Sequence, residues 1–281
     1  MNTELMERRV RNFYVRWFRP HISREINRQR LKLVWDIWGY LPLLSIKSLS
    51  PSQKLRLLAR FLIIDWNVVH GHKPREISII CGAVAERPAQ NGEALLEAGC
   101  WQGGSSAKFS IICRMFGYHL SIYDSFCGVE EMEPEEKAGN YDFSGEYAAP
   151  ESVLQENLAR FGEKDLCSTH KGWFADTLAV VPVPYRVRIA YIDCDLAKGT
   201  KEALSGIVPA LTNDGWIFSQ DFHIKPVRNL LYDPGTWTRF GKGLPTITKL
   251  GQKLASIRFG QEETVESLNC PLTSDVKISN R

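Results

Sequence analysis

Three aspartates follow two short apolar runs in the second half of the chain. Asp193 and Asp195 come directly after the run 187–192, and Asp221 follows the run 216–219. Alternate residues of an extended segment point to the same side, and neighbouring strand ends lie about 5 Å apart. The three carboxylates can therefore converge on a hard cation such as Mg²⁺, or one can act as a base beside the ion. The alternative interpretation is that they are solvated loop acids.

A glycine-rich turn follows an earlier apolar run, residues 94–98. It contains Gly99, Gly103 and Gly104, and Ser105 then stands where it can cap a helix. Glycines let the backbone approach a ligand closely, and the first amides of a helix attract anions. The turn is neither GxGxxG nor a Walker loop, so by itself it also fits a tight turn that binds nothing.

Asp124 ends the next apolar run, residues 120–123. An acid at this position can accept hydrogen bonds from the hydroxyls of a ribose, as in dinucleotide-binding folds. The alternative is that Asp124 caps the following loop.

These side chains need a sheet to hold them together. From residue 94 onward, short apolar runs alternate with amphipathic segments. The pattern predicts strands at 94–98, 120–123, 167–170, 187–192 and 216–219, and helices at 105–116, 152–161 and 200–211. This order predicts a doubly wound, mostly parallel, Rossmann-like α/β sheet, which binds ligands at the carboxyl ends of its strands. Upstream we expect a helix over 51–70, capped by Ser50, and another that begins at Pro74.

The composition excludes several classes of protein. The seven cysteines are an odd number without CxxC spacing, which argues against a disulfide framework or a cysteine-rich zinc site and suits a reducing cytosol. The first 60 residues hold 13 Lys and Arg against four Asp and Glu, and the remainder is net acidic by six charges. This distribution is not that of a uniformly basic nucleic-acid-binding protein, so we expect no nucleic-acid partner.

The basic N-terminal segment has two interpretations. Residues 4–46 combine helical spacing with aromatic and basic side chains, which suits the surface of a membrane. They suit equally a helical cap on the same domain or a dimerisation arm. The apolar stretch 33–46 is too short to span a bilayer, and no secretory signal is evident. We expect a cytoplasmic homo-oligomer, peripheral at the membrane in the first interpretation. We expect an extension over 1–72, a main domain over 73–262 and a polar tail over 263–281.

Four motifs resemble those of the macrocin-type (TylF-like) O-methyltransferases. The segment from Leu96 to Ser105 is similar to E-x-G-V-W-R-G-G-S, and Asp124-Ser125-Phe126-x-Gly128 to D-S-F-x-G. Residues 171–178 match K-G-W-F-x-D-T-L, and residues 192–196 resemble L-D-G-D-L. The motifs occur in the family's order and cover roughly residues 90–222.

The resemblance implies a class I fold that binds S-adenosylmethionine (SAM) and a divalent metal, with Mg²⁺ expected, and transfers a methyl group to a hydroxyl. The acceptor would be a small molecule or glycan, usually through a sugar. The residues implied around SAM are Glu97, Gly99, Trp101, Gly103, Gly104, Ser105, Asp124, Ser125, Gly172 and Trp173. The implied metal ligands are Asp193 and Asp221, and Asp195 is then the candidate base.

The chain also departs from the family pattern. Gln220 replaces the first of two adjacent acids, Cys194 replaces a glycine, and residues 197–199 replace Tyr-Glu-Ser. The family has a catalytic histidine shortly before the helix near residue 152, and residues 140–143, in that neighbourhood, contain none. Asp142 is therefore the candidate substitute, with Tyr141 as the alternative. These departures leave a catalytically degenerate scaffold or membrane-bound binding module open.

Two further inferences concern the ligands. A nicotinamide-dependent sugar enzyme is a second enzymatic reading, but the missing GxGxxG counts against it. The acceptor is expected at loops 128–149 and 223–245, where the candidate sugar contacts are Tyr141, Trp237, Arg239 and Phe240.

Overall fold

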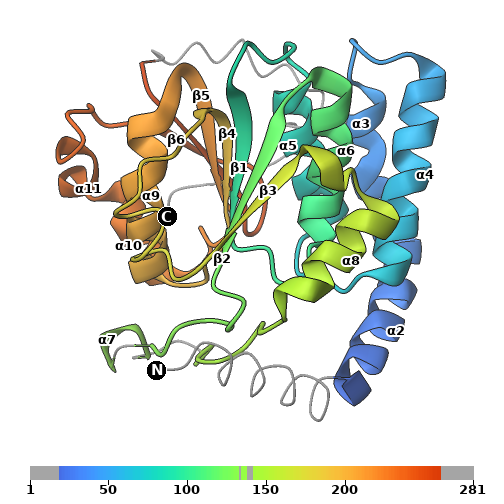
Figure 1. The fold of residues 1–281 in the computed structure, drawn as a ribbon, viewed down its shortest axis with the longest axis horizontal. Helices are drawn as coiled ribbons and strands as arrows, with labels where there is room; N and C mark the ends of the chain where they lie inside the picture. Colours follow the sequence, from blue (N-terminus) through green and yellow to red (C-terminus); the bar gives the residue numbers. More distant parts are fainter. Residues whose placement is uncertain (1–18, 133, 138–141, 261–281) are drawn as a thin grey trace, which may run out of the picture.

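A sheet of seven strands forms the centre of the molecule (Figure 1). The computed structural model describes residues 19–132, 134–137 and 142–260. The strands are β1 (Glu93–Ala98), β2 (His119–Asp124), β3 (Cys167–Lys171), β4 (Arg186–Ile192), β5 (Leu211–Ser219), β6 (Thr246–Lys249) and β7 (Ala255–Arg258). Their order across the sheet is β3-β2-β1-β4-β5-β7-β6. The chain winds outward from β1 in both directions, so the predicted doubly wound sheet is confirmed.

The five predicted strands are parallel to one another, and each is present. Every residue of β1 is buried, as expected for a strand that is covered on both faces. β6 and β7, which were not predicted from the sequence, form an antiparallel pair at the edge beside β5. Each has only four residues, too few for a clear alternation of apolar and polar side chains.

Helices cover both faces of the sheet and bury two separate cores (Figure 1). On one face lie α5 (Pro74–Val84), α6 (Gly104–Phe116) and α8 (Glu151–Phe161), and on the other α9 (Ala197–Ala210), α10 (Lys225–Tyr232) and α11 (Pro234–Thr238). The short helices α7 (Pro134–Lys137) and η3 (Lys164–Leu166) lie in the connections.

The N-terminal helices pack on the face of α5 and α6. They are α2 (Arg19–Asp36), η2 (Ile37–Tyr40), α3 (Leu41–Leu44) and α4 (Pro51–Asn67). Tyr40, Leu43 and Phe61 belong to the same core as residues of β1 and β2, so this part of the extension is a packed cap. Residues 1–18, the first part of the predicted membrane-contacting segment, lie outside the described residues, as do Tyr141 and the predicted tail 263–281.

The predicted cap of α4 is confirmed, because Ser50 Oγ accepts from the Gln53 amide and the Gln53 side chain accepts from the Ser50 amide. The helix ends at Asn67 rather than at residue 70, since Val68 adopts an extended backbone. The following residues, 68–73, form a loop that runs towards the carboxyl ends of the strands.

The segment 223–245, which we expected to be an acceptor-binding loop, is largely helical. Trp237 is fully buried, and its Nε1 donates to the Leu231 carbonyl at 2.9 Å, so its prediction as a sugar contact is wrong. Arg239 donates to the Lys201 carbonyl at 3.2 Å and stacks on Phe240. Among the described helices, none joins the length and the apolar composition that a bilayer crossing needs.

Candidate cofactor and metal site

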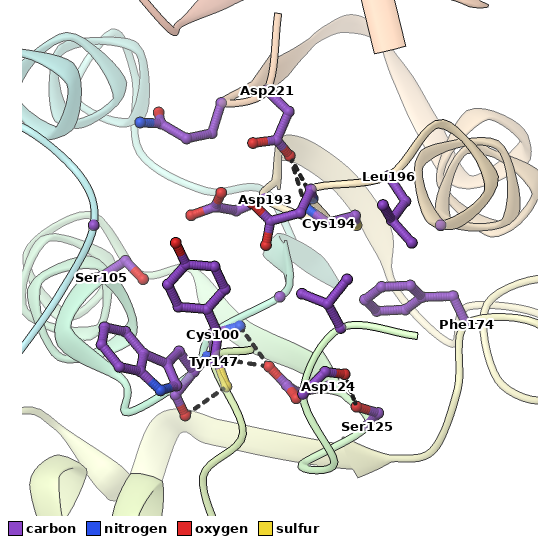
Figure 2. Close-up of a pocket in the computed structure, with 18 of the residues that line it drawn as sticks. Cys100, Ser105, Asp124, Ser125, Tyr147, Phe174, Asp193, Cys194, Leu196 and Asp221 are labelled. Carbon is purple, nitrogen blue, oxygen red and sulfur yellow. Dashed lines mark hydrogen bonds between the residues drawn. The ribbon is translucent and has the colours of Figure 1, made fainter. Parts of the chain in front are cut away.

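A cavity lies at the carboxyl ends of β1, β2, β4 and β5 (Figure 2). The predicted site residues that line it are Gly99, Trp101, Gly104, Ser105, Asp124, Ser125, Trp173, Asp193, Asp195 and Asp221. Asp124 and Ser125 lie at one end of the view in Figure 2, and Asp193 and Asp221 lie at the other. The structure thus brings residues 122 positions apart in the chain into one cavity, as expected for strand ends at a single edge.

The glycine-rich turn is shaped by close backbone contacts. Gly99 has φ +88°, and a Cβ atom there would lie 1.9 Å from the carbonyl oxygen of Asp193. A Cβ atom on Gly104 would lie 2.8 Å from Cβ of His70. Gly99 therefore lets the segments after β1 and β4 meet, and Gly104 lets the loop 68–73 lie against the first turn of α6.

Asp124 organises this turn from the end of β2. Its Oδ2 accepts from the amides of Cys100 at 2.7 Å and Trp101 at 3.1 Å, and its Oδ1 accepts from the Phe126 amide at 2.7 Å. An ionised carboxylate has about four acceptor positions, so capacity for a further donor remains. Asp124 is both a cap of the loop and a residue of the cavity wall, and the two interpretations of it are compatible.

Three of the predicted cofactor residues do not line the cavity. Glu97 is fully buried and accepts from Ser105 Oγ and, at 2.5 Å, from Ser106 Oγ. Burial raises its pKa to about 8, although both hydroxyls act in the opposite direction. Gly103 is the N-cap of α6 and lies against Leu154 of α8. Gly172 donates its amide to the Asp124 carbonyl at 3.0 Å. These three residues thus position the residues that line the cavity and do not line it themselves.

The three predicted aspartates converge. Each of Asp193, Asp195 and Asp221 offers a carboxylate oxygen, and these oxygens all lie within 4.8 Å of one another. Asp221 Oδ2 accepts from the amides of Cys194 at 2.9 Å and Asp195 at 2.8 Å. The Tyr191 hydroxyl donates to Asp193 Oδ2 at 3.1 Å.

The electrostatics of this cluster favour a cation. Burial, followed by repulsion from Asp193, raises the pKa of Asp195 to about 7. Burial, followed by repulsion from Asp195, raises the pKa of Asp221 to about 8. Burial and the charge of Asp221 raise the pKa of Asp193. Carboxylates that repel each other in this way bind protons or a hard cation in preference to remaining ionised and unpaired.

Gln220 also lines the cavity beside this cluster and is 2% exposed. Its Nε2 donates to Glu76 Oε2 at 2.8 Å, and because a carboxylate only accepts, this contact fixes which end of the amide faces Glu76. Its Oε1 is buried and has no hydrogen-bond partner among the residues that the structure describes, and neither has Glu76 Oε1. A buried oxygen left without a partner costs about 1–3 kcal/mol, so a bound cation or ligand donor would be stabilising here. The donor set and these unpartnered oxygens fit a divalent ion.

Two further residues in the cavity wall were missed. Lys253, in the turn between β6 and β7, contributes positive charge that lowers the pKa of each of the three aspartates. Because β6 and β7 were not predicted, no pattern in the sequence indicated it. Tyr147 packs edge-on against Trp101, with the two ring centroids 5.3 Å apart, and lines the same cavity (Figure 2).

Trp101, Tyr147 and Asp195 share a feature of the backbone, since each has a positive φ, of 48°, 58° and 60°. Such strained non-glycine residues often cluster at functional sites.

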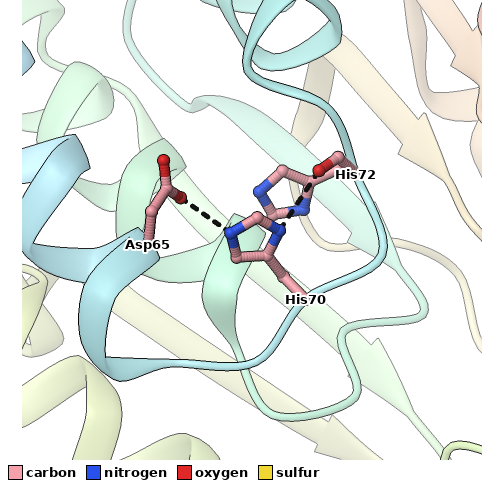
Figure 3. Close-up of side chains that lie close together, drawn as sticks. All are labelled: Asp65, His70 and His72. Carbon is pink, nitrogen blue, oxygen red and sulfur yellow. Dashed lines mark hydrogen bonds and ion pairs between the residues drawn. The ribbon is translucent and has the colours of Figure 1, made fainter. Parts of the chain in front are cut away.

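The loop after α4 supplies another unpredicted part of the wall, with His70 and His72 (Figure 3). The two imidazoles stack 4.0 Å apart, and Nε2 of His70 lies 2.7 Å from Asp65 Oδ1. Asp65, His70 and His72 have the composition of a metal site, but the Lys108 ammonium already pairs with Asp65 and contacts His72. Burial opposes ionisation of Asp65, but the charges and hydrogen bonds of Lys108 and His70 together outweigh it and lower the pKa of this carboxyl. Lys108 is thus the cation of this cluster.

Asp142 is not brought into the cavity. Its Oδ1 accepts from Ser144 Oγ at 2.5 Å, and its Oδ2 lies 3.2 Å from Lys137 Nζ. The hydrogen bond from Ser144 lowers the pKa of Asp142, which makes its carboxylate a weaker base. Of the two predicted bases, only Asp195 lines the cavity.

Comparisons with known proteins agree with this geometry. The chain is 30% identical over 148 residues to an 8-demethyl-8-(2,3-dimethoxy-alpha-L-rhamnosyl)-tetracenomycin-C 4'-O-methyltransferase of Streptomyces olivaceus, a match that covers 50% of this chain and 56% of that protein. It is 24% identical over 144 residues to the demethyldecarbamoylnovobiocin O-methyltransferase of Streptomyces niveus, covering 47% and 53%. The matches thus span about half the length of these curated relatives.

Solved structures show the same fold. The O-methyltransferase NovP superposes with a TM-score of 0.57 at 17% identity, over 83% of this chain and 100% of that one. The calicheamicin methyltransferase CalS11 superposes with a TM-score of 0.53 at 18% identity, over 86% and 94%. The fold is therefore that of the class I SAM-dependent methyltransferases. The family model of the macrocin-O-methyltransferases (TylF) matches residues 83–236, more than half of the chain. The four motifs, the strand order and this match show that the chain belongs to the macrocin-O-methyltransferase (TylF) family.

Proposed function

We propose that this protein is a SAM-dependent O-methyltransferase that methylates a sugar hydroxyl of a glycosylated metabolite or glycan precursor, with assistance from Mg²⁺. The observation that carries the proposal is the single cavity that joins Asp124, beneath the glycine-rich turn, to the carboxylates of Asp193, Asp195 and Asp221. The first two relatives support the acceptor class, since one is named for a rhamnosyl-bearing substrate and both are named as O-methyltransferases.

The residues around Asp124 suit the nucleoside of SAM. The Asp124 carboxylate has spare acceptor capacity and would accept hydrogen bonds from the ribose hydroxyls. Trp173 and Phe174 offer aromatic surface in the same wall of the cavity. Trp101 Nε1 is buried and has no hydrogen-bond partner in the described part of the chain, so a donor is available to a ligand. SAM supplies an activated methyl group, and the chain therefore has mainly to position the acceptor and remove its proton.

At the other end of the cavity, Asp193, Asp221 and the amide oxygen of Gln220 would hold the cation. A divalent ion lowers the pKa of a hydroxyl that it binds. Asp195 would accept the proton of the acceptor at its carboxylate, because a pKa of about 7 suits a base at neutral pH. The oxygen of Gln220 is neutral and binds Mg²⁺ more weakly than a carboxylate, which favours a binding module without turnover as the second candidate.

Calorimetric titration with S-adenosylhomocysteine tests the cofactor part of the proposal. We expect micromolar binding by the parent and a loss of at least about tenfold in Asp124→Asn, which exchanges one of two accepting oxygens for a donor. Asp165→Asn is the matched control, since Asp165 is exposed and pairs with Arg114 outside the cavity. No binding by the parent would refute the cofactor assignment.

Methyl transfer to a panel of glycosylated acceptors, in Mg²⁺ and then in EDTA, tests the rest. Loss of transfer in EDTA, and in Asp193→Asn and Asp221→Asn with cofactor binding retained, would support the metal role. Cofactor binding without transfer to any acceptor would support the binding module. The cytoplasmic location, the homo-oligomer and the contact with a membrane stay predictions.

A further inference from the structure

An apolar surface lies exposed on the N-terminal helices. We define the N-terminal apolar face as Leu31, Val34, Trp35 and Trp38 of α2 and η2, together with Ile63 and Trp66 of α4. Trp35 is 80% exposed, Leu31 74% and Trp38 68%. Among the described residues, nine of the fourteen exposed large apolar side chains lie between positions 31 and 66. A concentration of this kind on a folded surface marks an interaction site.

Helical spacing explains why these side chains share one face. Leu31, Trp35 and Trp38 follow one another at intervals of four and three residues, which places them along one side of α2 and its continuation. The opposite side of α2 packs on α4, where Gln29 Nε2 donates to the carbonyls of Asp65 at 2.5 Å and Val68 at 2.8 Å. Because the opposite side of α2 is hydrogen-bonded to α4, the apolar stripe faces away from the rest of the protein.

The two helices also form a groove between them. Val34, Ile37, Ile63 and Trp66 line it. Arg30 of α2 fixes the position of Trp66 of α4. Its Nε donates to the Trp66 carbonyl at 2.8 Å, and its guanidinium lies 4.8 Å from the centre of the Trp66 ring. The groove is preorganised before any partner binds.

The charges beside the apolar face indicate the kind of partner. Arg24 and Arg28 are exposed on α2 and continue the same stripe towards its N-terminal end, and Lys32 is exposed next to Leu31 in the helix. Of the acids in the described part of α2, Glu25 lies 3.9 Å from Arg28, and Asp36 is the other. The first 60 residues together carry a large excess of positive charge. Two copies of this face would bring like charges together, whereas anionic headgroups complement them.

We propose that the N-terminal apolar face binds an anionic lipid surface, with Trp35 and Trp38 at the depth of the headgroups and the basic side chains on the phosphates. Tryptophan suits this depth because one end of its ring system is apolar and the other donates a hydrogen bond. Figure 1 places α2 at the edge of the molecule, beside α4. Trp66 stands four residues before His70, which lines the cavity. An acceptor carried by the same lipid surface would be presented near the cavity, although the binding itself does not depend on the proposed reaction.

Co-sedimentation of the full chain with vesicles tests the proposal. We compare vesicles of phosphatidylcholine with vesicles that also contain phosphatidylglycerol. We expect binding to the anionic vesicles alone, weakened as the salt concentration rises from about 0.05 to 0.5 M. Arg24→Gln/Arg28→Gln/Lys32→Gln should weaken binding by about 100-fold, at about fivefold for each charge. Trp35→Ser/Trp38→Ser should weaken it by about tenfold or more.

Val180→Ser/Val181→Ser is the matched control, because these side chains are 68% and 58% exposed but lie outside the apolar face. It should bind the vesicles as the parent does. Urea unfolding should give the same midpoint for all variants, since none of the changed side chains is buried. S-adenosylhomocysteine affinity, measured on the same samples, reports on the proposed function separately.

Three results would overturn the proposal. The first is a parent chain that leaves anionic vesicles unbound. The second is a tryptophan variant that binds them as tightly as the parent and the valine control. The third is a parent dimer, seen by light scattering without lipid, that Trp35→Ser/Trp38→Ser converts to monomers, because a second copy would then cover this face.

Discussion

The ammonium of Lys108 lies 2.7 Å from Nε2 of His72, and both side chains are buried. An ammonium can only donate, so Nε2 accepts and the proton of a neutral His72 resides on Nδ1. Burial, followed by the charges of His70 and Lys108, lowers the pKa of His72, which favours this neutral form. Lys108 thereby ties the loop 68–73 to α6 and fixes the tautomer of a histidine in the cavity wall.

Replacing Lys108 should destabilise the protein strongly. Lys108→Met leaves the buried carboxylate of Asp65 without its cation, and we expect the free energy of unfolding to fall by about 3–5 kcal/mol. Urea unfolding measures the change. Lys198→Met is the control, since Lys198 pairs with Glu130 at 2.7 Å on the surface and should cost less than about 1 kcal/mol.

Adding Asp65→Asn to Lys108→Met should recover part of the loss, because the unpaired charge is then removed. A Lys108→Met protein as stable as the control would show that the buried pair contributes nothing.

Glu97 should make the stability depend on pH. The pKa of an unfolded glutamate is about 4.3, and burial raises that of Glu97 to about 8. Between these values the folded state binds more protons, so the free energy of unfolding falls as the pH rises. Glu97→Gln removes this contribution, and its stability relative to the parent should rise from pH 5 to pH 9 in urea unfolding.

Glu93 supplies a control of opposite sign. Burial opposes its ionisation, but the hydrogen bonds from Arg87 and the Gln90 amide, together with the charge of Arg87, outweigh burial and lower its pKa. Its stabilising contribution is present above the unfolded pKa and is lost as the pH falls, so Glu93→Gln should lose stability at neutral pH. A difference between Glu97→Gln and the parent that did not change with pH would contradict the assignment.

Exchanging Glu76 and Gln220 should strengthen cation binding. Glu76→Gln/Gln220→Glu can keep the 2.8 Å hydrogen bond between the two positions while moving the negative charge into the cavity wall. Because a carboxylate is a harder ligand than an amide, we expect the dissociation constant for Mg²⁺ to fall by about tenfold in calorimetry.

Gln220→Met, which lacks the oxygen, should weaken the binding of Mg²⁺. Unchanged affinity in both proteins would place the ion away from residue 220. Gln155→Met is a suitable control, because Gln155 pairs with Thr169 outside the cavity.

Gly99 should tolerate no side chain, whereas Gly117, which also has a positive φ, should tolerate one at a smaller cost. Gly117→Ala, at φ +79° with open space around it, should cost about 1 kcal/mol from backbone strain alone. Gly99→Ala adds a clash with the Asp193 carbonyl, and we expect about 3 kcal/mol or more. Thermal and urea unfolding distinguish the two variants. Equal costs would mean that the segments after β1 and β4 can move apart freely.

Much of this arrangement could be predicted from the sequence, because it depends on local patterns. The buried runs that end at Ala98, Asp124 and Ile192 specify parallel strands, and parallel strands place their ends at one edge of a sheet. The motif residues Asp124, Asp193 and Asp221 therefore had to lie along one edge of the sheet once the strand order was known. Ser50 and Gln53 likewise specified the start of α4 by their spacing.

Contacts between distant segments were decided only by the tertiary structure. Glu76 meets Gln220 across 144 residues, and Lys253 enters the cavity from a turn between two four-residue strands. Glu97 belongs to a cofactor motif, yet it accepts from Ser105 and Ser106 and does not line the cavity. Spacing along the chain records which face of an element a side chain occupies. It does not record which other element covers that face, and burial, charge pairing and cavity shape depend on that packing.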